Sequence, residues 1–391
     1  MLNTPFSPWP SFTQEEAEAV SRVLLSNKVN YWTGQECREF EKEFATWCGS
    51  EYAIALANGT LALDLALKVL DIGHGDEVVV TSRTFLASAS SIVTAGAVPV
   101  FADVDRDSQN ITADTVLAVL TPRTRAIICV HLAGWPCEMD EIMALAEEKG
   151  LYVIEDCAQA HGARYKGRAV GSIGHFGAWS FCQDKIMTTG GEGGMLTMNR
   201  RDWWKKAWSY KDHGKSWDAV YEREHPPGFR WVHESFGTNW RMTELQGVIG
   251  RIQLARMPEW HAARKANALR LADAAEACPA LRVPLPAAEV EHAWYKFYMF
   301  VRPEMLGVGW SRDRIMAEIV AAGVPCYSGS CSEVYLERAF DGTGWRPEPG
   351  LAVAHELGET ALMMLVHPTL SDAEIGKAGE VLRDVMARAS C

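Results

Sequence analysis

Asp156 and Lys185 are the residues whose types and spacing most clearly suggest chemistry. Asp156 ends the apolar run YVIED, and Lys185 lies between the run AWSF and the glycine-rich TTGGEGG. A strand-terminal acid and a lysine on a second strand suit pyridoxal 5'-phosphate (PLP). The lysine forms a Schiff base with the cofactor aldehyde, while the acid keeps the pyridine nitrogen protonated, so that the ring accepts electrons. Removal from water favours the uncharged, nucleophilic amine, so we expect Lys185 to be at least partly buried.

Three further residues suggest a phosphate site near this pair. Gly59 and Thr60 follow an apolar run and open a predicted helix. Backbone N–H groups at a helix N-terminus bind phosphate, and glycine permits close approach, although a simple helix cap explains the same pattern. The Ser180 hydroxyl, five residues before Lys185, is placed to contact the phosphate while the lysine reaches the aldehyde. We therefore predict phosphate contacts from Gly59, Thr60 and Ser180.

Other side chains are candidates for holding the cofactor ring. Gln159 follows Asp156 in the same predicted turn and is expected to bond the phenolic oxygen of PLP. Phe85, in TSRTFLASAS, is expected to cover one face of the ring, with a core aromatic as the alternative interpretation. Asn239 and Arg241, in GTNWRMTEL, precede a long predicted helix.

Predicted strands and helices alternate along the first half of the chain, and their ends position these residues. Continuous apolar strands such as AIICV are typical of a parallel sheet that is covered on both faces. Two closely spaced strands around Lys185 predict an antiparallel element, and Pro258 is expected to break the long helix that begins near 243. We expect an α/β fold: an N-terminal arm and large PLP-binding domain over 1–260, with a mostly parallel central sheet, and a smaller α+β domain over 261–391.

Bulk composition excludes several classes of function. The chain has 391 residues, 48% of them hydrophobic, and a net charge of −12. An acidic balance argues against nucleic acid as the main partner. We expect no signal peptide and no membrane span, because no basic start and no apolar run of the necessary length is present. Ten scattered cysteines without a CxxC pair indicate free thiols in a reducing cytoplasm and no metal site.

Several longer motifs together resemble the DegT/DnrJ/EryC1/StrS family of PLP-dependent nucleotide-sugar aminotransferases. They include ANGTLALDLAL, VIEDCAQAHGARYKGRAVGSIGHFGAWSF, DKIMTTGGEGGML and NWRMTELQGVIGRIQL, so the resemblance covers nearly the whole chain. It implies a type I aminotransferase fold and a homodimer with shared active sites. It also implies Lys185 as the Schiff-base lysine and Asp156 as the partner of the pyridine nitrogen. Asn239 resembles an asparagine that the neighbouring subunit lends to the phosphate.

The resemblance implies amino transfer from L-glutamate to a nucleotide-linked keto sugar. The expected acceptor is a 4-keto-6-deoxyhexose, with a UDP-2-acetamido-2,6-dideoxy-4-hexulose favoured by the stretch SGSCSEVYLERAF. The expected pathway makes an amino sugar of lipopolysaccharide, capsule or another glycan. Candidates for contacting the sugar nucleotide lie in loops or at element ends: Lys28, Tyr31, Trp32, His213, Lys215 and Arg241.

Three other functions remain open on the sequence. A sugar 3-dehydratase of this family would carry histidine in place of Lys185. A cyclitol ketone of the scyllo-inosose type is an alternative acceptor that the sequence separates poorly from a sugar nucleotide. A non-catalytic regulator with the same fold is disfavoured by the acidic charge and by the intact pair of Asp156 and Lys185.

Overall fold

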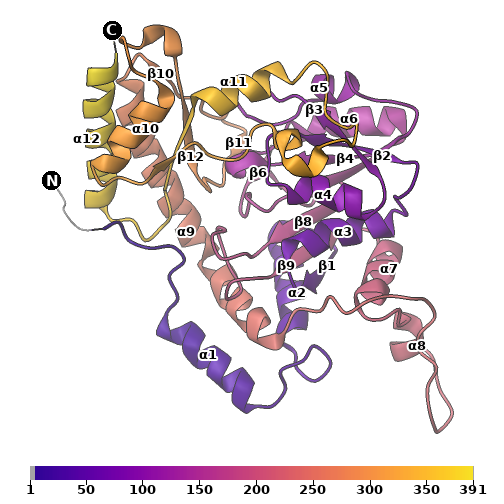
Figure 1. Ribbon diagram of the computed structural model, residues 1–391. Helices are drawn as coiled ribbons and strands as arrows, with labels where there is room; N and C mark the ends of the chain where they lie inside the picture. Colours follow the sequence, from indigo (N-terminus) through magenta and orange to yellow (C-terminus); the bar gives the residue numbers. More distant parts are fainter. Residues whose placement is uncertain (1–4, 391) are drawn as a thin grey trace.

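The computed structural model describes residues 5–390, so Cys391 lies outside the described chain. A seven-stranded sheet forms its centre (Figure 1). All neighbouring strands are parallel except at β9, which runs antiparallel to both β8 and β1. The predicted antiparallel element around Lys185 is therefore confirmed. In spatial order the strands are β1 (Tyr52–Leu56), β9 (Gly194–Met198), β8 (Phe176–Ser180), β5 (Tyr152–Asp156), β4 (Thr124–Val130), β2 (Glu77–Thr81) and β3 (Val98–Ala102).

Helices cover both faces of this sheet, which explains its continuous apolar strands. Val78 and Val80 of β2 pack in one cluster with α3, α4 and α7, whereas Val79 between them packs with α5 and α6 on the other face. Successive strand residues point to opposite faces, so a strand covered twice needs apolar residues at every position. The helices are α3 (Gly59–Val69), α4 (Ala87–Thr94), α5 (Ala113–Leu117), α6 (Met139–Lys149), α7 (Arg201–Lys211) and the short α8 (Trp217–Tyr221).

The predicted break at Pro258 is wrong. One continuous helix, α9 (Glu244–Glu276), contains this proline in its interior. Its first half packs against α2 and its second half against α12, so tertiary packing on both sides of Pro258 outweighs the local cost of a proline. The boundary that we proposed at residue 260 falls within α9 and stays a prediction.

A second sheet and its helices form the C-terminal part of the chain. These elements are β10 (Leu281–Arg282), β12 (Phe297–Val301), β14 (Ala361–Met364), β13 (Cys326–Tyr327), α10 (Arg312–Ala321), α11 (Ala352–Thr360) and α12 (Asp372–Ala389). A small third sheet joins β11 (Val290–Glu291), β6 (Arg164–Tyr165) and β7 (Arg168–Ala169).

The N-terminal arm contacts both parts of the chain. Its extended segment lies beside α12 and α9, and α1 (Gln14–Leu25) then packs against the first half of α9 before α2 (Glu36–Cys48) returns to the large sheet (Figure 1). A capping box begins α1, in which the Thr13 backbone N–H donates to the Glu16 carboxylate over 2.6 Å. Within residues 5–390, no helix combines the length and apolar character that crossing a membrane requires.

A buried ion pair joins α2 to α7 beside β1. The Lys211 ammonium is fully buried and lies 3.1 Å from the Glu41 carboxylate. Glu41 also accepts hydrogen bonds from the Ala55 backbone N–H (2.9 Å) and the Tyr31 hydroxyl (3.2 Å). Removing the cation from such a pair strongly destabilises the fold, because the carboxylate charge is then buried without compensation.

We therefore expect Lys211→Met to lower the free energy of unfolding by about 3–5 kcal/mol in urea titrations. The control is Lys205→Met, which removes a partly exposed pair with Asp218 and should cost less than about 1 kcal/mol. Adding Glu41→Gln to Lys211→Met should recover part of the loss. Equal effects of the two single changes would contradict this role of the buried pair.

Candidate active site

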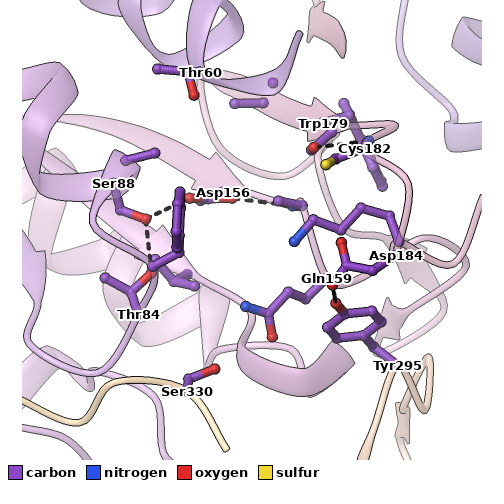
Figure 2. A pocket seen from close by; sticks show the side chains of 18 of the residues that line it. Thr60, Thr84, Ser88, Asp156, Gln159, Trp179, Cys182, Asp184, Tyr295 and Ser330 are labelled. Atoms are coloured by element: carbon purple, nitrogen blue, oxygen red, sulfur yellow. Dashed lines mark hydrogen bonds between the residues drawn. The ribbon is translucent and has the colours of Figure 1, made fainter. Parts of the chain in front are cut away.

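A cavity of about 850 Å³ lies between the carboxyl ends of the large-sheet strands and the second sheet. Ligands of open α/β sheets gather at this edge. The turns after β1, β2, β5 and β8 contribute one wall, and residues around β12, β13 and β14 contribute the other. The cavity contains every predicted cofactor residue except Asn239: Gly59, Thr60, Phe85, Asp156, Gln159, Ser180 and Lys185 (Figure 2).

Asp156, the last residue of β5, is a buried acid without an ion-pair partner in the described chain. Its carboxylate accepts hydrogen bonds from the Ser88 hydroxyl (2.8 Å) and the Ala158 backbone N–H (3.1 Å). Burial raises the pKa of Asp156 above its ordinary value, and these two hydrogen bonds and the charge of Lys185 only oppose that increase. A protonated pyridine nitrogen would supply the missing cationic partner.

The neighbouring Glu155 has a purely structural environment. Its carboxylate accepts from the backbone N–H groups of Gly171 and Ile173 and lies 3.0 Å from His131 Nε2. The Cys137 backbone N–H donates to the other ring nitrogen of His131. Glu155, His131 and Cys157 are close enough together to bind a metal ion. However, the hydrogen bonds above already occupy the Glu155 carboxylate and both ring nitrogens of His131. Their contacts hold the loop after β7 against β5 and provide no argument for a metal site.

Lys185 lies in the loop between β8 and β9, half-buried, with its amine directed into the cavity. The Lys185 Nζ atom makes no hydrogen bond or ion pair with the residues that the structure describes. Its backbone is held from both sides, because its N–H donates to the Cys182 carbonyl (3.1 Å) and its carbonyl accepts from the Trp9 indole (2.7 Å). The preceding Asp184 accepts from the Tyr295 hydroxyl over 2.5 Å. The amine is thus free to react while its backbone is fixed.

The three predicted phosphate residues converge at the start of α3. The Asn58 side chain caps this helix by accepting from the Leu61 N–H, which leaves the N–H groups of Gly59 and Thr60 at the cavity wall. A Cβ at Gly59 would lie 2.5 Å from Ser180 Cβ, so only glycine allows the turn to approach β8 this closely. The site therefore offers backbone donors and a hydroxyl at one point, as a phosphate group requires.

Gln159 and Phe85, which were predicted to contact the cofactor ring, both line the cavity. Gln159 Oε1 accepts from the Ala133 backbone N–H over 2.8 Å, which turns the side-chain amide nitrogen toward the cavity (Figure 2). Phe85 lines the cavity and is 71% exposed, which is unusual for a large aromatic and leaves its ring face available for stacking.

The predicted substrate residues form a separate group outside this cavity. Trp32 Nε1, Lys215 Nζ and Arg241 Nη1 all converge on the buried Asp212 carboxylate, at 2.8, 2.8 and 2.7 Å. His213 adopts a left-handed conformation (φ 60°) beside them, and Asp212 pairs with Asn239 in a β-bridge. Within the described chain, neither Asn239 nor any of the six predicted substrate residues lines the cavity.

Two of those six predictions have contrasting environments. Lys28 is exposed, whereas Tyr31 is only 3% exposed and is bonded to Glu41 in the core. Burial raises the pKa of the Tyr31 hydroxyl, and the adjacent Glu41 charge adds to this. The geometry therefore gives Tyr31 a structural role in this chain and provides no contact that supports its predicted role toward substrate.

Several residues of the cavity were missed by sequence reasoning. Ser88, Trp9 and Tyr295 support Asp156 and Lys185, and Lys296 lines the cavity itself. The signal for Lys296 was a single charged residue within the apolar run AWYKFYMFV, where a lysine must be either at an edge or at a site. The contacts of Trp9 and Tyr295 depend on the packing of distant elements and have no local signal.

Comparison with known proteins agrees with this geometry. The model of the DegT/DnrJ/EryC1/StrS aminotransferase family matches residues 10–383. The X-ray structure of an aminotransferase from Psychrobacter cryohalolentis is 65% identical and superposes with a TM-score of 0.97 over 98% of this chain and 99% of that one. The GDP-perosamine synthase of Caulobacter vibrioides is 36% identical and covers 89% of each chain. A UDP-N-acetyl-3-dehydro-alpha-D-glucosamine 3-aminotransferase of Acidithiobacillus ferrooxidans is 33% identical, covering 98% of this chain and 96% of its own.

Three independent features of the described chain fit PLP: a buried acid that lacks a cation, an unpaired lysine amine, and a glycine turn whose backbone N–H groups are placed to bind a phosphate. The family match extends over the segments that carry all three. The chain therefore belongs to the DegT/DnrJ/EryC1/StrS family of PLP-dependent sugar aminotransferases.

Proposed function

We propose that this enzyme transfers the amino group of L-glutamate to a nucleotide-linked 4-keto-6-deoxyhexose, with a UDP-2-acetamido-2,6-dideoxy-4-hexulose as the first candidate. The observation that carries the proposal is the pairing of Asp156 and an unpartnered Lys185 in one cavity. The cavity volume of about 850 Å³ is near the upper end for small-molecule sites and leaves room for a sugar beside the cofactor. Two relatives are named for GDP- and UDP-linked amino sugars, which supports a nucleotide-linked acceptor.

Each residue has a defined task in this reaction. Bound PLP supplies a ring that accepts the electron pair released at the donor carbon. Asp156 holds a proton on the ring nitrogen, because its own buried charge needs a cation. Lys185 would remove the proton from the α-carbon of L-glutamate and deliver it to the carbon that carries the cofactor's aldehyde. In the second half-reaction it would take a proton from that cofactor carbon and deliver it to the former keto carbon of the sugar, which keeps the amine. One amine serves both transfers, so it must remain free of ion pairs, as Lys185 is in the described chain.

We propose further that the active enzyme is a homodimer with shared sites. Asn239 and Arg241 lie outside the cavity of their own chain, which is consistent with a role in the partner's site. The segment between α8 and α9 extends from the body (Figure 1) and exposes three large aromatics, Phe229, Trp231 and Phe236. Clustered exposed aromatics mark interaction surfaces. A second copy of this chain is the partner that would bring Asn239 to the cofactor phosphate.

The proposed location is the cytoplasm, and the proposed pathway supplies an amino sugar to lipopolysaccharide, capsule or another glycan. All nine cysteines in residues 5–390 are free thiols, as in proteins of a reducing compartment. Eight of the nine are buried or half-buried, so packing rather than disulfide formation explains their presence.

The first test is a half-reaction. Adding L-glutamate to the PLP-loaded protein should remove the visible absorption band of the lysine-bound cofactor, and a keto-sugar nucleotide should restore it. The acceptor panel should include UDP-, dTDP- and GDP-linked 4-keto and 3-keto sugars and scyllo-inosose, with the position of the new amine read by NMR. Lys185→Ala should lose at least about 100-fold in turnover, because it removes the general acid–base. Retention of more than about 1% of the rate would contradict this role, and restoration by scyllo-inosose alone would replace the proposed acceptor.

The phosphate-binding turn can be tested at Gly59. We expect Gly59→Ala to weaken PLP binding by roughly 5- to 150-fold, since a clash with Ser180 costs about 1–3 kcal/mol. The matched control is Gly376→Ala in α12, where the nearest atom to the new Cβ lies 4.0 Å away. Fluorescence titration of the apo-protein with PLP measures both constants. Unchanged affinity in the Gly59 variant would show that the phosphate lies elsewhere.

Shared sites predict complementation between two inactive variants. Asn239→Asp should repel the phosphate and inactivate the partner's site, whereas Lys185→Ala inactivates its own. When equal amounts of the two variants exchange subunits at random, the mixture should regain about a quarter of wild-type activity. Half of the dimers are then hybrids, and each hybrid holds one complete site out of two. If Asn239 acted in its own chain, hybrids would contain no complete site and the mixture would stay inactive.

A further inference from the structure

Lys296 forms the part of the cavity wall that the reaction described above does not use. It precedes β12, is only partly exposed, and has its Nζ 4.8 Å from the centroid of the Tyr295 ring. Lys185 Nζ lies 5.3 Å from the centroid of the same ring. Within residues 5–390, the Lys296 ammonium makes no hydrogen bond or ion pair. A desolvated ammonium without an anionic partner is costly unless a ligand supplies one.

A second buried cation lies behind this wall. The Arg264 guanidinium is 1% exposed and stacks 5.0 Å from the Trp9 ring. Its Nη1 reaches only the carbonyls of Trp294 and Tyr295, at 3.5 and 3.4 Å, and its Nε and Nη2 have no partner in the described chain. The acid whose charge acts on Lys296 is Asp184, which already accepts from the Tyr295 hydroxyl. This end of the cavity therefore holds an excess of positive charge.

The ionisation of both groups reflects the missing anion. Burial, with the charges of Arg264 and Lys185, lowers the pKa of Lys296 to about 8, and Asp184 only partly opposes this. Burial also lowers the pKa of Arg264 to about 9. An anion bound against Lys296 would favour both charged forms, because an opposite charge raises the pKa of a base.

The place of Lys296 beside the reactive amine decides which anion it suits. The α-carboxylate of an amino acid is attached to the same carbon from which Lys185 removes a proton. The diphosphate of a nucleotide sugar is attached at C1, across the ring from a keto group at C4, and so lies farther from Lys185. A cation that shares the Tyr295 ring with Lys185 is therefore matched to a carboxylate.

We propose that Lys296 binds a carboxylate of the amino donor, and that Arg264 is a positioning residue that strengthens this site from behind. This inference rests on the proposed function, since it assigns the donor's place in the same cavity. It predicts that Lys296 acts in the donor half-reaction only.

The test compares Lys296→Met with Lys296→Arg, which keeps the positive charge. Loss of the visible band upon mixing with L-glutamate measures donor affinity, and protein loaded with pyridoxamine phosphate measures the keto-sugar half-reaction without any donor. Maleate, a dicarboxylate that cannot react, measures carboxylate binding through its perturbation of the same band. An unchanged visible band and circular dichroism spectrum check that each variant is folded and loaded.

We expect Lys296→Met to raise the Kd for L-glutamate and for maleate by about 10- to 100-fold, the usual effect of losing a hydrogen bond to a charged group. Lys296→Arg should stay much closer to wild type, and the keto-sugar half-reaction should be unchanged in both. Unaltered binding of L-glutamate and maleate would overturn the inference. A loss confined to the keto-sugar half-reaction would also overturn it, because Lys296 would then bind the diphosphate. If the wild-type protein does not react with L-glutamate but binds maleate through Lys296, L-glutamate is not the donor, whereas the carboxylate site is supported.

Discussion

Burial of the Asp156 carboxylate at the end of β5 is the constraint from which the rest of the site follows. A charge in this position needs compensation, and the Ser88 hydroxyl and one backbone N–H supply only part of it. In the proposed mechanism, the cofactor's protonated ring nitrogen would complete this compensation. The parallel sheet, covered on both faces, is what removes Asp156 from water while leaving its oxygen atoms at a cavity.

Lys185 must then lie near this acid while its amine forms no ion pair with another residue. The antiparallel strand β9 returns the chain directly after β8, so that Lys185 lies in a loop at the same edge of the sheet as Asp156. Trp9 from the N-terminal arm holds its carbonyl, and Tyr295 from beside β12 holds the neighbouring Asp184. Segments far apart in sequence thus fix the backbone, and the amine itself stays unpaired. The same wall contains Lys296, so the segments that hold the proposed nucleophile also carry the proposed carboxylate site.

Sequence reasoning located residues correctly where a local pattern determines their place in the fold, while their chemical roles stay predictions. Asp156 ends the apolar strand β5, and Gly59 and Lys185 follow the strands β1 and β8. The carboxyl ends of these strands meet at one edge of the sheet, so all three residues line the same cavity. It failed where packing overrides local preference, as at Pro258 within α9. Tyr31 lies in a loop, as predicted, but its hydroxyl is buried against Glu41, a contact that depends on how α2 meets α7 and that the sequence did not indicate. The convergence of Trp32, Lys215 and Arg241 on Asp212 likewise depends on tertiary structure.

The most direct measurement of the central claim is chemical trapping of the cofactor. Reduction of the PLP-loaded protein with borohydride makes the bond between lysine and cofactor permanent, and peptide mass spectrometry then identifies the lysine. The account predicts a phosphopyridoxyl group on Lys185 and an unmodified Lys296. A modified Lys296, or a protein that binds PLP without any trapped lysine, would contradict the assignment of Lys185 as the reactive amine.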